Sequence, residues 1–272
     1  MFSIRRGNRR KPLEIPQIKA LLTGLCQNLW GFLYPLRCAS CGTLKLPSNS
    51  THWCDTCLSS LCWIRSPMCP RCGRPFPSLE EQEDHLCEDC IQEESWFDEA
   101  RSAVLYDHGS ASRGILELKF SRRLYWAPIL AELMEVVVRE TEWNERVELL
   151  VPVPLHLRRL RSRGFNQSAL LAKFLGKRIG KPVTYRVLER FRWTPPQTRL
   201  SRQKRLQNLK RAFRVTKPEL IEGKAILLVD DVFTTGATLN ECSRCLKEAG
   251  ASRVFGITVA RSAPDLGDYF SI

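Results

Sequence analysis

Apolar residues recur along the second half of the chain in two alternating patterns. Continuous apolar runs predict strands buried on both faces at residues 102–106, 147–153, 225–231 and 253–259. Apolar residues at three- and four-residue spacing predict helices at 112–120, 127–140, 166–180 and 237–249. We expect one further short strand at 182–187. Strands that alternate with helices imply an α/β fold with a mainly parallel sheet, flanking helices and right-handed crossovers.

The first 36 residues form a basic segment that carries one amphipathic stripe. Apolar residues from Ile18 to Leu33 recur at helical spacing, and polar residues such as Gln27 and Asn28 break the apolar run. No small-residue cleavage site follows, so this segment is not typical of a signal peptide. We therefore expect a cytoplasmic protein that is not an integral membrane protein. The helix packs on a domain or partner, with attachment to a membrane surface as the alternative.

Cysteine spacing predicts a metal-binding module at residues 37–95. Eight of the 12 cysteines form four CxxC pairs, and in a reducing compartment such pairs are metal ligands. Two CxxC turns make one closed four-cysteine site, which is typical of structural rather than catalytic zinc. Four turns therefore predict a small tandem zinc ribbon with two structural zinc ions. Sequential pairing groups Cys38, Cys41, Cys54 and Cys57, and then Cys69, Cys72, Cys87 and Cys90; interleaved pairing is the alternative. A fifth pair, Cys242 and Cys245, lies inside a predicted helix and fits core packing.

The positive charge of the chain is concentrated in one segment. The whole sequence has a formal net charge of +13, but residues 158–217 alone contain 19 Lys and Arg and a single acid, Glu189. Residues 38–100 are acidic, with 11 Asp and Glu against 4 Lys and Arg. The basic segment predicts a polyanionic ligand such as phosphate, diphosphate or nucleic acid.

A phosphate-binding pattern follows the predicted strand at 225–231. Asp230 and Asp231 stand at the carboxyl end of this strand, where open α/β sheets bind their ligands. The next residues open the helix at 237–249 and can surround a phosphate with backbone N–H groups and hydroxyls: Thr234, Thr235, Gly236, Ala237 and Thr238. Carboxylates do not bind the same phosphate, but they fit neighbouring sugar hydroxyls. A phosphorylated ribose satisfies both halves of the pattern.

The run from Ile226 to Leu239 resembles the binding motif of type I phosphoribosyltransferases. The resemblance implies that Asp230 and Asp231 hold the ribose hydroxyls of phosphoribosyl diphosphate, and that residues 234–238 hold its 5′-phosphate. It also implies a type I phosphoribosyltransferase-like domain, which we place at residues 96–272. Mg²⁺ is expected with the diphosphate, because it binds substrate oxygens and water and needs few protein carboxylates.

Two arginine-rich segments precede this motif. The first is a loop that ends at Gly164 before a predicted helix, and the second, residues 189–205, is expected to be a mobile loop that closes over bound substrate. Guanidinium groups bind phosphate oxygens in pairs, so we expect diphosphate contacts from Arg158, Arg163 and Arg205. Solvated basic faces are the alternative interpretation of both segments.

These segments, with the CxxC pairs ahead of them, resemble the ComF competence family, a zinc ribbon joined to a phosphoribosyltransferase-like domain. The matching motifs include Val153 to His156 and Arg163 to Gln167, in the family's order. The resemblance implies a cytoplasmic role in natural transformation, handling single-stranded DNA beside a helicase-like partner, with phosphoribosyl transfer to an acceptor. One alternative is a non-catalytic DNA-uptake adaptor that binds single strands by charge and stacking. Another is a nucleotide-salvage phosphoribosyltransferase.

Overall fold

The computed structural model describes residues 37–44, 50, 52–76, 83–106, 109–193, 209 and 211–262. The chain forms two compact units, residues 1–58 and 59–272, which we describe separately. The basic segment at residues 1–36 lies outside the described residues. The domain limits expected from the sequence, 1–36, 37–95 and 96–272, stay a prediction. They follow motif boundaries, whereas the two compact units are defined by contacts in the structure.

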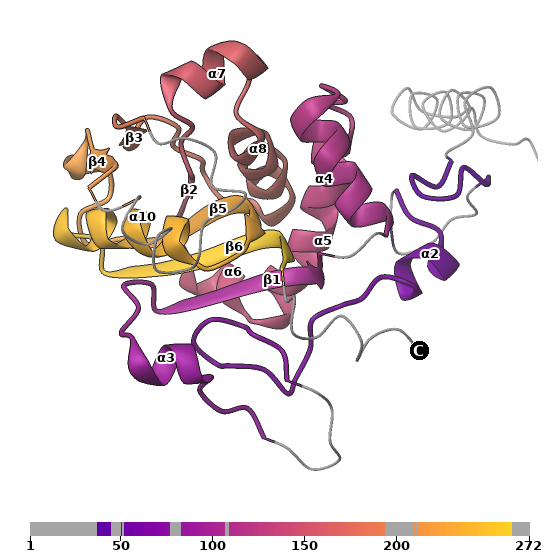
Figure 1. Cartoon of the computed structure of the whole chain (residues 1–272), viewed down its shortest axis with the longest axis horizontal. Helices are drawn as coiled ribbons and strands as arrows, with labels where there is room; N and C mark the ends of the chain where they lie inside the picture. Colours follow the sequence, from indigo (N-terminus) through magenta and orange to yellow (C-terminus); the bar gives the residue numbers. More distant parts are fainter. Residues whose placement is uncertain are drawn as a thin grey trace, which may run out of the picture. The chain divides into compact units, whose positions relative to one another are not determined.

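The larger unit is built on a parallel four-stranded sheet (Figure 1). Its strands are β1 (Glu99–Leu105), β2 (Leu149–Pro152), β5 (Ala225–Phe233) and β6 (Arg253–Arg261), in the order β1-β6-β5-β2. All three pairings are parallel. The two central strands are buried along nearly their whole length, which explains their continuous apolar runs. The predicted α/β fold with a parallel sheet is confirmed.

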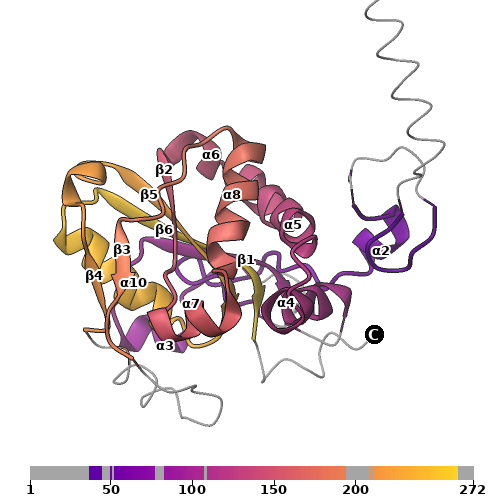
Figure 2. The ribbon, with the colours of Figure 1, turned by 90° about the horizontal axis from the view of Figure 1, so that it is seen from above.

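Helices cover both faces of this sheet (Figures 1 and 2). On one face α5 (Trp126–Glu140) and α8 (Gln167–Ile179) contact each other and the strands, with α4 (Ser110–Phe120) and the short α6 (Trp143–Arg146) beside α5. On the other face lies α10 (Ala237–Glu248), whose apolar residues pack on β5 and β6. The helices predicted at 112–120, 127–140, 166–180 and 237–249 are therefore confirmed.

A glycine sets the close packing of α4 on α5. A Cβ atom at Gly114 would lie 2.5 Å from the Trp126 ring, so a larger residue would push the two helices apart. Trp126 is fully buried, and its indole N–H donates to Glu117 Oε2 (2.7 Å). This pair fixes the position of the last turn of α4, which carries Lys119 to the edge of the sheet where β5 ends.

The smaller unit carries the first group of cysteines. An isolated bridge joins Arg37 to Leu44 around the first CxxC turn, and the second turn runs into α2 (Asp55–Ser59). Within this turn the backbone N–H of Cys38 donates a hydrogen bond to Thr43 O (2.9 Å). This is the knuckle geometry that aims two sulfur atoms at one point.

The second group of cysteines belongs to the larger unit. A bridge between Met68 and Pro75 and the helix α3 (Glu88–Gln92) hold its two CxxC turns. The knuckle docks on β1, where Ala100 N donates to Arg71 O (2.7 Å) and Arg101 Nη1 donates to Pro70 O (2.8 Å). The two predicted ribbons are therefore similar in sequence spacing and different in their surroundings.

The prediction of a strand at residues 182–187 is wrong. Only Val183 pairs with the sheet, through a single bridge to Leu150, and the chain then leaves the sheet edge. Tyr185 and Arg186 are exposed, so the segment has no continuous apolar face to keep it on the sheet. The next strand is instead β3 (Leu188–Arg190), which pairs antiparallel with β4 (Phe213–Val215). A short 3₁₀ helix, η1 (Pro218–Leu220), leads from β4 to β5.

The first arginine-rich segment is a helix rather than the predicted loop. α7 (Leu157–Arg163) begins after His156, whose ring nitrogen accepts a hydrogen bond from Arg158 N (3.1 Å). It ends at Gly164, which adopts φ +85°, a conformation that favours glycine. Arginine is a good helix former, and a helix projects these side chains in several directions. Among the helices in the described part of the chain, none has the length and apolarity needed to cross a bilayer.

Candidate functional site

The acid pair lies near the carboxyl end of β5, as the sequence predicts. Asp230 and Asp231 are both buried, and β5 continues for two residues beyond them. Asp230 Oδ1 accepts hydrogen bonds from Ser168 Oγ (2.8 Å) and from Asp231 N (2.9 Å). Asp231 Oδ2 lies 2.9 Å from Lys119 Nζ at the end of α4. Both carboxylates are therefore held in fixed positions before any ligand arrives.

The segment from Arg163 to Ser168 builds one side of this site. Asn166 caps α8 by accepting from Ser168 N (3.0 Å), and its amide donates to Val153 O (3.0 Å) at the end of β2. Arg163 Nη1 donates to Gln167 Oε1 (2.6 Å) across the same turn. Because Asn166 fixes the first turn of α8, the Ser168 hydroxyl is aimed at Asp230.

The loop after β5 opens α10 with its backbone N–H groups free of helix partners. Gly236 is the N-cap and adopts φ +76°, which a residue with a side chain rarely takes up. Thr235 Oγ1 accepts a hydrogen bond from Ala237 N (3.4 Å), while Thr234 is exposed. The first turn of a 12-residue helix offers donors and a positive dipole end to an anion. The structure brings residues 234–238 next to the acid pair on one strand-to-helix turn.

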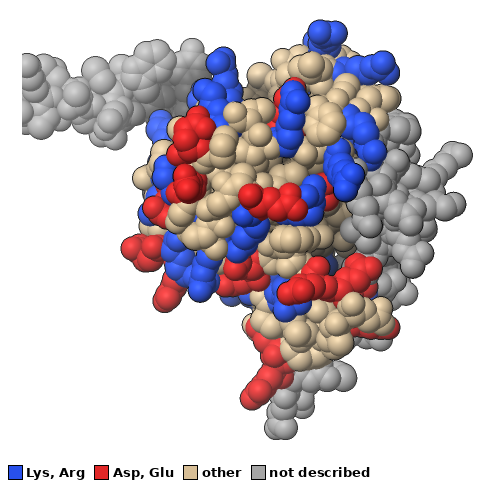
Figure 3. Space-filling view, turned by 90° about the vertical axis from the view of Figure 1, so that its left-hand side faces the viewer, with Lys and Arg blue, Asp and Glu red and all other residues tan. Residues whose placement is uncertain are grey.

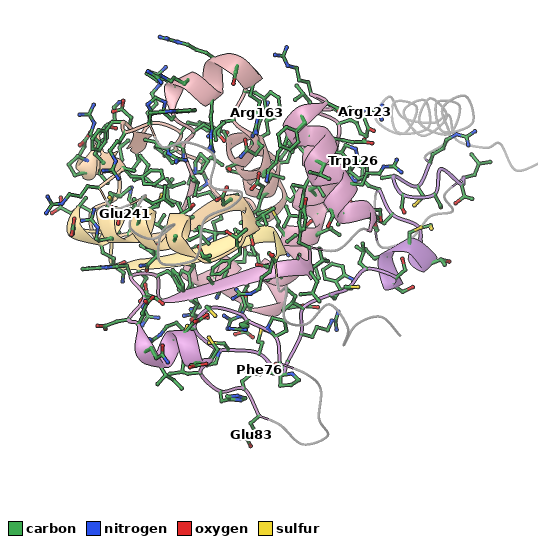
Figure 4. All side chains as sticks on the ribbon, viewed as in Figure 1. Phe76, Glu83, Arg123, Trp126, Arg163 and Glu241 are labelled. Atoms are coloured by element: carbon green, nitrogen blue, oxygen red, sulfur yellow. The ribbon has the colours of Figure 1, made fainter. Side chains whose placement is uncertain are left out.

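Basic side chains converge on the acid pair from three elements. Lys119 from α4 pairs with Asp231, and Arg163 from the end of α7 lies between α7 and α4, with its guanidinium 5.5 Å from the Phe120 ring (Figure 4). Partial burial lowers the pKa of Arg163, and the charge of Asp231 acts in the opposite direction. Burial and the charge of Arg159 lower the pKa of Arg190 on β3. Cations that repel each other in a partly dry site are stabilised by a bound polyanion.

The three predicted arginine contacts differ in position. Arg163 lies beside the acid pair, whereas Arg158 lies over the Trp193 ring, with its guanidinium 5.5 Å from the ring centre. Arg205 and the whole segment at residues 194–208 lie outside the described residues. Lys119, Ser168, Arg159 and Arg190 were not predicted from the sequence. A lysine in the last turn of an amphipathic helix is ordinary, so the residues around Lys119 do not distinguish it. The one available signal was its position at the end of a predicted helix, which can bring it to the edge of the sheet.

Asp230 also makes the stability of the chain depend on pH. Burial, and then the charge of Asp231, raise the pKa of Asp230 to about 7. A raised carboxyl pKa stabilises the folded chain at low pH, and this contribution is lost as the pH rises from about 4 through about 7. Asp230→Asn has no charge to bury, so it should be stabilised relative to wild type as the pH rises. We expect the difference between the thermal midpoints of the variant and of wild type to increase by about 4 °C or more from pH 5 to pH 8.

This shift is measured by following thermal unfolding of both proteins by circular dichroism at the two pH values. Glu219→Gln, a change at an exposed acid, is the control and should give the same difference from wild type at both. A constant difference for Asp230→Asn as well would contradict the assignment of the raised pKa to this carboxyl.

The eight CxxC cysteines form two groups in sequential pairing. The sulfur atoms of Cys38, Cys41, Cys54 and Cys57 lie within 4.8 Å of one another, as do those of Cys69, Cys72, Cys87 and Cys90. The Sγ atoms of Cys41 and Cys54 are 3.8 Å apart, and those of Cys72 and Cys87 are 3.6 Å apart. Four thiolates at about 2.3 Å from a central zinc ion are about 3.8 Å from each other, so both groups fit a tetrahedral zinc site. Cys242 and Cys245 are buried in α10, which confirms core packing.

Two domain families match the chain. Residues 29–91 match the double zinc ribbon domain, and residues 166–265 match the phosphoribosyl transferase domain. The first match covers both cysteine groups, and the second covers α8, β5, the loop at residues 234–238 and β6.

Similar curated proteins carry names from DNA uptake and use. The chain is 35% identical over 221 residues to the DNA utilization protein YhgH of Salmonella typhimurium, covering 79% of this chain and 93% of the relative. It is 33% identical to Competence protein F of Haemophilus influenzae, covering 81% and 95%. It is 31% identical to Competence protein ComFC of Bacillus subtilis, covering 77% and 84%. Among solved structures, glutamine phosphoribosylpyrophosphate amidotransferase from Bacillus subtilis aligns over 53% of this chain and 30% of its own, with 19% identity and a TM-score of 0.37.

Proposed function

The chain belongs to the ComF family, and on that premise we propose that it acts in DNA uptake during natural transformation and binds phosphoribosyl diphosphate. One observation carries the second part of the proposal. Two buried carboxylates and a glycine-capped loop at the N-terminus of α10 lie together at the end of β5. Family membership also supports a place in the cytoplasm beside a helicase-like DNA-uptake protein.

In the proposed complex each part of the substrate meets groups of matching chemistry. Asp230 and Asp231 accept hydrogen bonds from the two ribose hydroxyls, and residues 234–238 donate to the 5′-phosphate. The diphosphate lies toward Arg163 and Lys119, with Arg159 and Arg190 adding positive charge. When the ribose hydroxyls reach Asp231, Lys119 loses its partner there and is free to turn toward phosphate oxygens. Mg²⁺ bound with the diphosphate would supply further charge neutralisation.

The transfer reaction that this site could support is a substitution at the anomeric carbon. The bond from this carbon to the diphosphate oxygen breaks, and its electron pair leaves with the diphosphate. An acceptor nitrogen or oxygen forms the new bond and loses a proton to solvent. The departing diphosphate gathers negative charge, so Arg163 and Lys119 would stabilise the transition state more than the ground state.

Calorimetry on the purified chain with phosphoribosyl diphosphate and Mg²⁺ tests the binding proposal. Turnover is then followed as diphosphate release after single-stranded DNA, nucleotide mixtures or free bases are added as acceptors. Release with free bases alone would favour the salvage alternative, and release with nucleic acid would favour transfer during DNA uptake. The absence of a binding signal at millimolar ligand would contradict the proposal.

We further propose that both four-cysteine groups bind zinc and that the ions are structural. All four ligands of each site come from the protein, which leaves no coordination position for a substrate or a water molecule. The bound ions would hold the knuckle turns, which have little apolar surface of their own to bury.

One observation favours binding of single-stranded DNA as a second function. The Trp193 ring lies 5.5 Å from the Arg158 guanidinium, 5.7 Å from that of Arg159 and 5.2 Å from the His156 ring. Nearby, the guanidinium of Arg214 on β4 lies 5.4 Å from the ring of Phe191, the exposed residue that follows β3. Lys and Arg side chains also gather along the upper edge of the face in Figure 3. Aromatic rings among cations are the groups on which proteins stack unpaired bases.

Replacing Trp193 and Arg192 with alanine is expected to weaken binding of single-stranded DNA by about 10-fold or more and to make it less dependent on salt. The loss combines one stacking surface and one phosphate contact. Fluorescence anisotropy with a labelled oligonucleotide at several salt concentrations measures both effects. Trp96→Ala with Arg253→Ala removes the same residue types from exposed positions elsewhere and should bind like wild type. Equal affinities for the two double variants would contradict the assignment of the stacking surface.

A further inference from the structure

The second four-cysteine group is part of the core that supports residues 234–238, which we call the phosphate loop after their proposed role. Its four cysteines are buried and pack in one cluster with Phe97, Phe233, Ala237 and Leu239. These four partners come from the segment just before β1, the end of β5 and the first turn of α10. The metal site and the phosphate loop therefore share side-chain neighbours within the larger unit.

Arg261, the last residue of β6, connects the two directly. Its Nη1 donates to Cys72 O (2.8 Å), and its Nη2 donates to Cys72 Sγ (3.6 Å). The same guanidinium lies 4.2 Å from the centre of the Phe233 ring. Arg261 is 6% exposed, so these contacts fill its surroundings and fix its plane. A planar guanidinium can donate sideways to one group while its face stacks on a ring, which lysine does not reproduce.

Phe233 carries the connection to the loop. It is the last residue of β5, and its carbonyl accepts from Ser262 N (2.9 Å), the residue after Arg261. A Cβ atom at Gly236 would lie 2.6 Å from Phe233 Cζ, so the ring lies directly against the N-cap of α10. Displacing the Phe233 ring would leave Gly236 and the backbone N–H groups around it without this support.

The Cys72 sulfur, the Arg261 guanidinium, the Phe233 ring and Gly236 thus form a continuous series of contacts. We propose that Arg261 is a positioning residue that holds the phosphate loop in register with the second four-cysteine site, so that metal loss there weakens phosphate binding and metal loss at the first site does not. This inference rests on the proposed function for its ligand. It goes beyond that function because it gives one of the two metal sites a role in ligand binding.

The test compares Arg261→Met with wild type in the full chain. Methionine has a similar length and keeps the apolar contact with the ring, but it has no donor for Cys72. We expect amide exchange at residues 234–238, measured by mass spectrometry without ligand, to become about 10-fold faster, and affinity for phosphoribosyl diphosphate to fall by about the same factor. Metal content should stay that of wild type, because all four ligands remain. Arg261→Lys should give an intermediate exchange rate.

Arg101→Met is the matched control. Arg101 Nη1 donates to Pro70 O in the same knuckle, and its other contacts within the described residues are with Ala100, Glu99 and Trp143, so loop exchange should not change. Phe233→Leu provides a second route if Arg261→Met folds poorly. It should speed exchange at the same residues, and combining the two substitutions should add little to either alone.

Three results would overturn the proposal: loop exchange like wild type in both Arg261→Met and Phe233→Leu, additive effects in the double variant, or loop exchange that rises as much in Cys41→Ser as in Cys69→Ser. The exchange measurements need no ligand. If wild type fails to bind phosphoribosyl diphosphate, the proposed function fails while the contact between metal site and loop is still tested.

Discussion

Replacing Asp230 and Asp231 together with asparagine is expected to lower the affinity for phosphoribosyl diphosphate by about 100-fold or more, because each carboxylate that accepts from a hydroxyl contributes about 1.5–3 kcal/mol. Asparagine has nearly the same shape, so the sheet should be unaffected. Its amide, however, has one acceptor where the carboxylate has two. The substitution also removes the Asp231 carboxylate that pairs with Lys119. Release of Lys119 from this ion pair should not compensate for the lost contacts with the ribose hydroxyls.

Calorimetry on the double variant, with folding verified by circular dichroism, measures this loss. Glu219→Gln with Glu222→Gln makes the same change in charge at two exposed acids and should bind like wild type. An affinity of the Asp230 and Asp231 variant within about threefold of wild type, which is less than one hydrogen bond to a charged group contributes, would show that the ribose does not bind at the acid pair.

Loss of one metal site should destabilise the larger unit far more than loss of the other. Cys90→Ser is expected to lower the thermal midpoint of this unit by about 10 °C or more, since a structural zinc site contributes several kcal/mol and each kcal/mol moves the midpoint by about 2–4 °C. Cys90 is buried in the core cluster that contains Phe97 and Phe233. Cys57→Ser removes a ligand in residues 1–58, so the midpoint of the larger unit should change by less than about 2 °C.

Scanning calorimetry measures the midpoints, and metal analysis by mass spectrometry counts the ions. We expect two zinc ions per wild-type chain and one in each variant. Fewer than two ions in wild type would reject the double ribbon. Equal loss of stability in the two variants would reject the difference between the sites.

The sequence predicted the strand-to-helix turn at the end of β5 better than its surroundings. Residues 225–239 combine an apolar run, two acids and a threonine and glycine loop, and each of these signals is local. β5, the loop and α10 follow directly from them. The parallel sheet was predictable for the same reason, because strands buried on both faces have continuous apolar runs.

The predictions failed where distant residues decide the structure. The segment 182–187 has residues typical of strands, but Val183 alone forms a bridge to the four-stranded sheet, and Tyr185 is exposed. Residues 157–163 were expected to be a loop because of their arginines, although a cap at His156 and Gly164 at its end define a helix. Lys119 and Ser168 reach the acid pair only because α4 and α8 end or begin at the same sheet edge.

The two cysteine groups illustrate the same limit. Both have CxxC turns at similar spacing, and that spacing determines where four sulfur atoms meet. It contains no information on what packs outside them. Arg261 lies 189 residues after Cys72, so the link between them arises only from the parallel pairing of β1, β6 and β5.

The packing of the second cysteine group also bears on how fragments of this protein should be designed. A truncation at residue 96, which the motif boundaries suggest, would remove Cys72 and leave the Arg261 guanidinium without its acceptor. It would also expose Phe97 and the Phe233 ring. A fragment starting at Ser59 keeps the knuckle with the sheet that it supports. For expression or crystallisation of the phosphoribosyltransferase-like part, the natural cut therefore lies between the two ribbons.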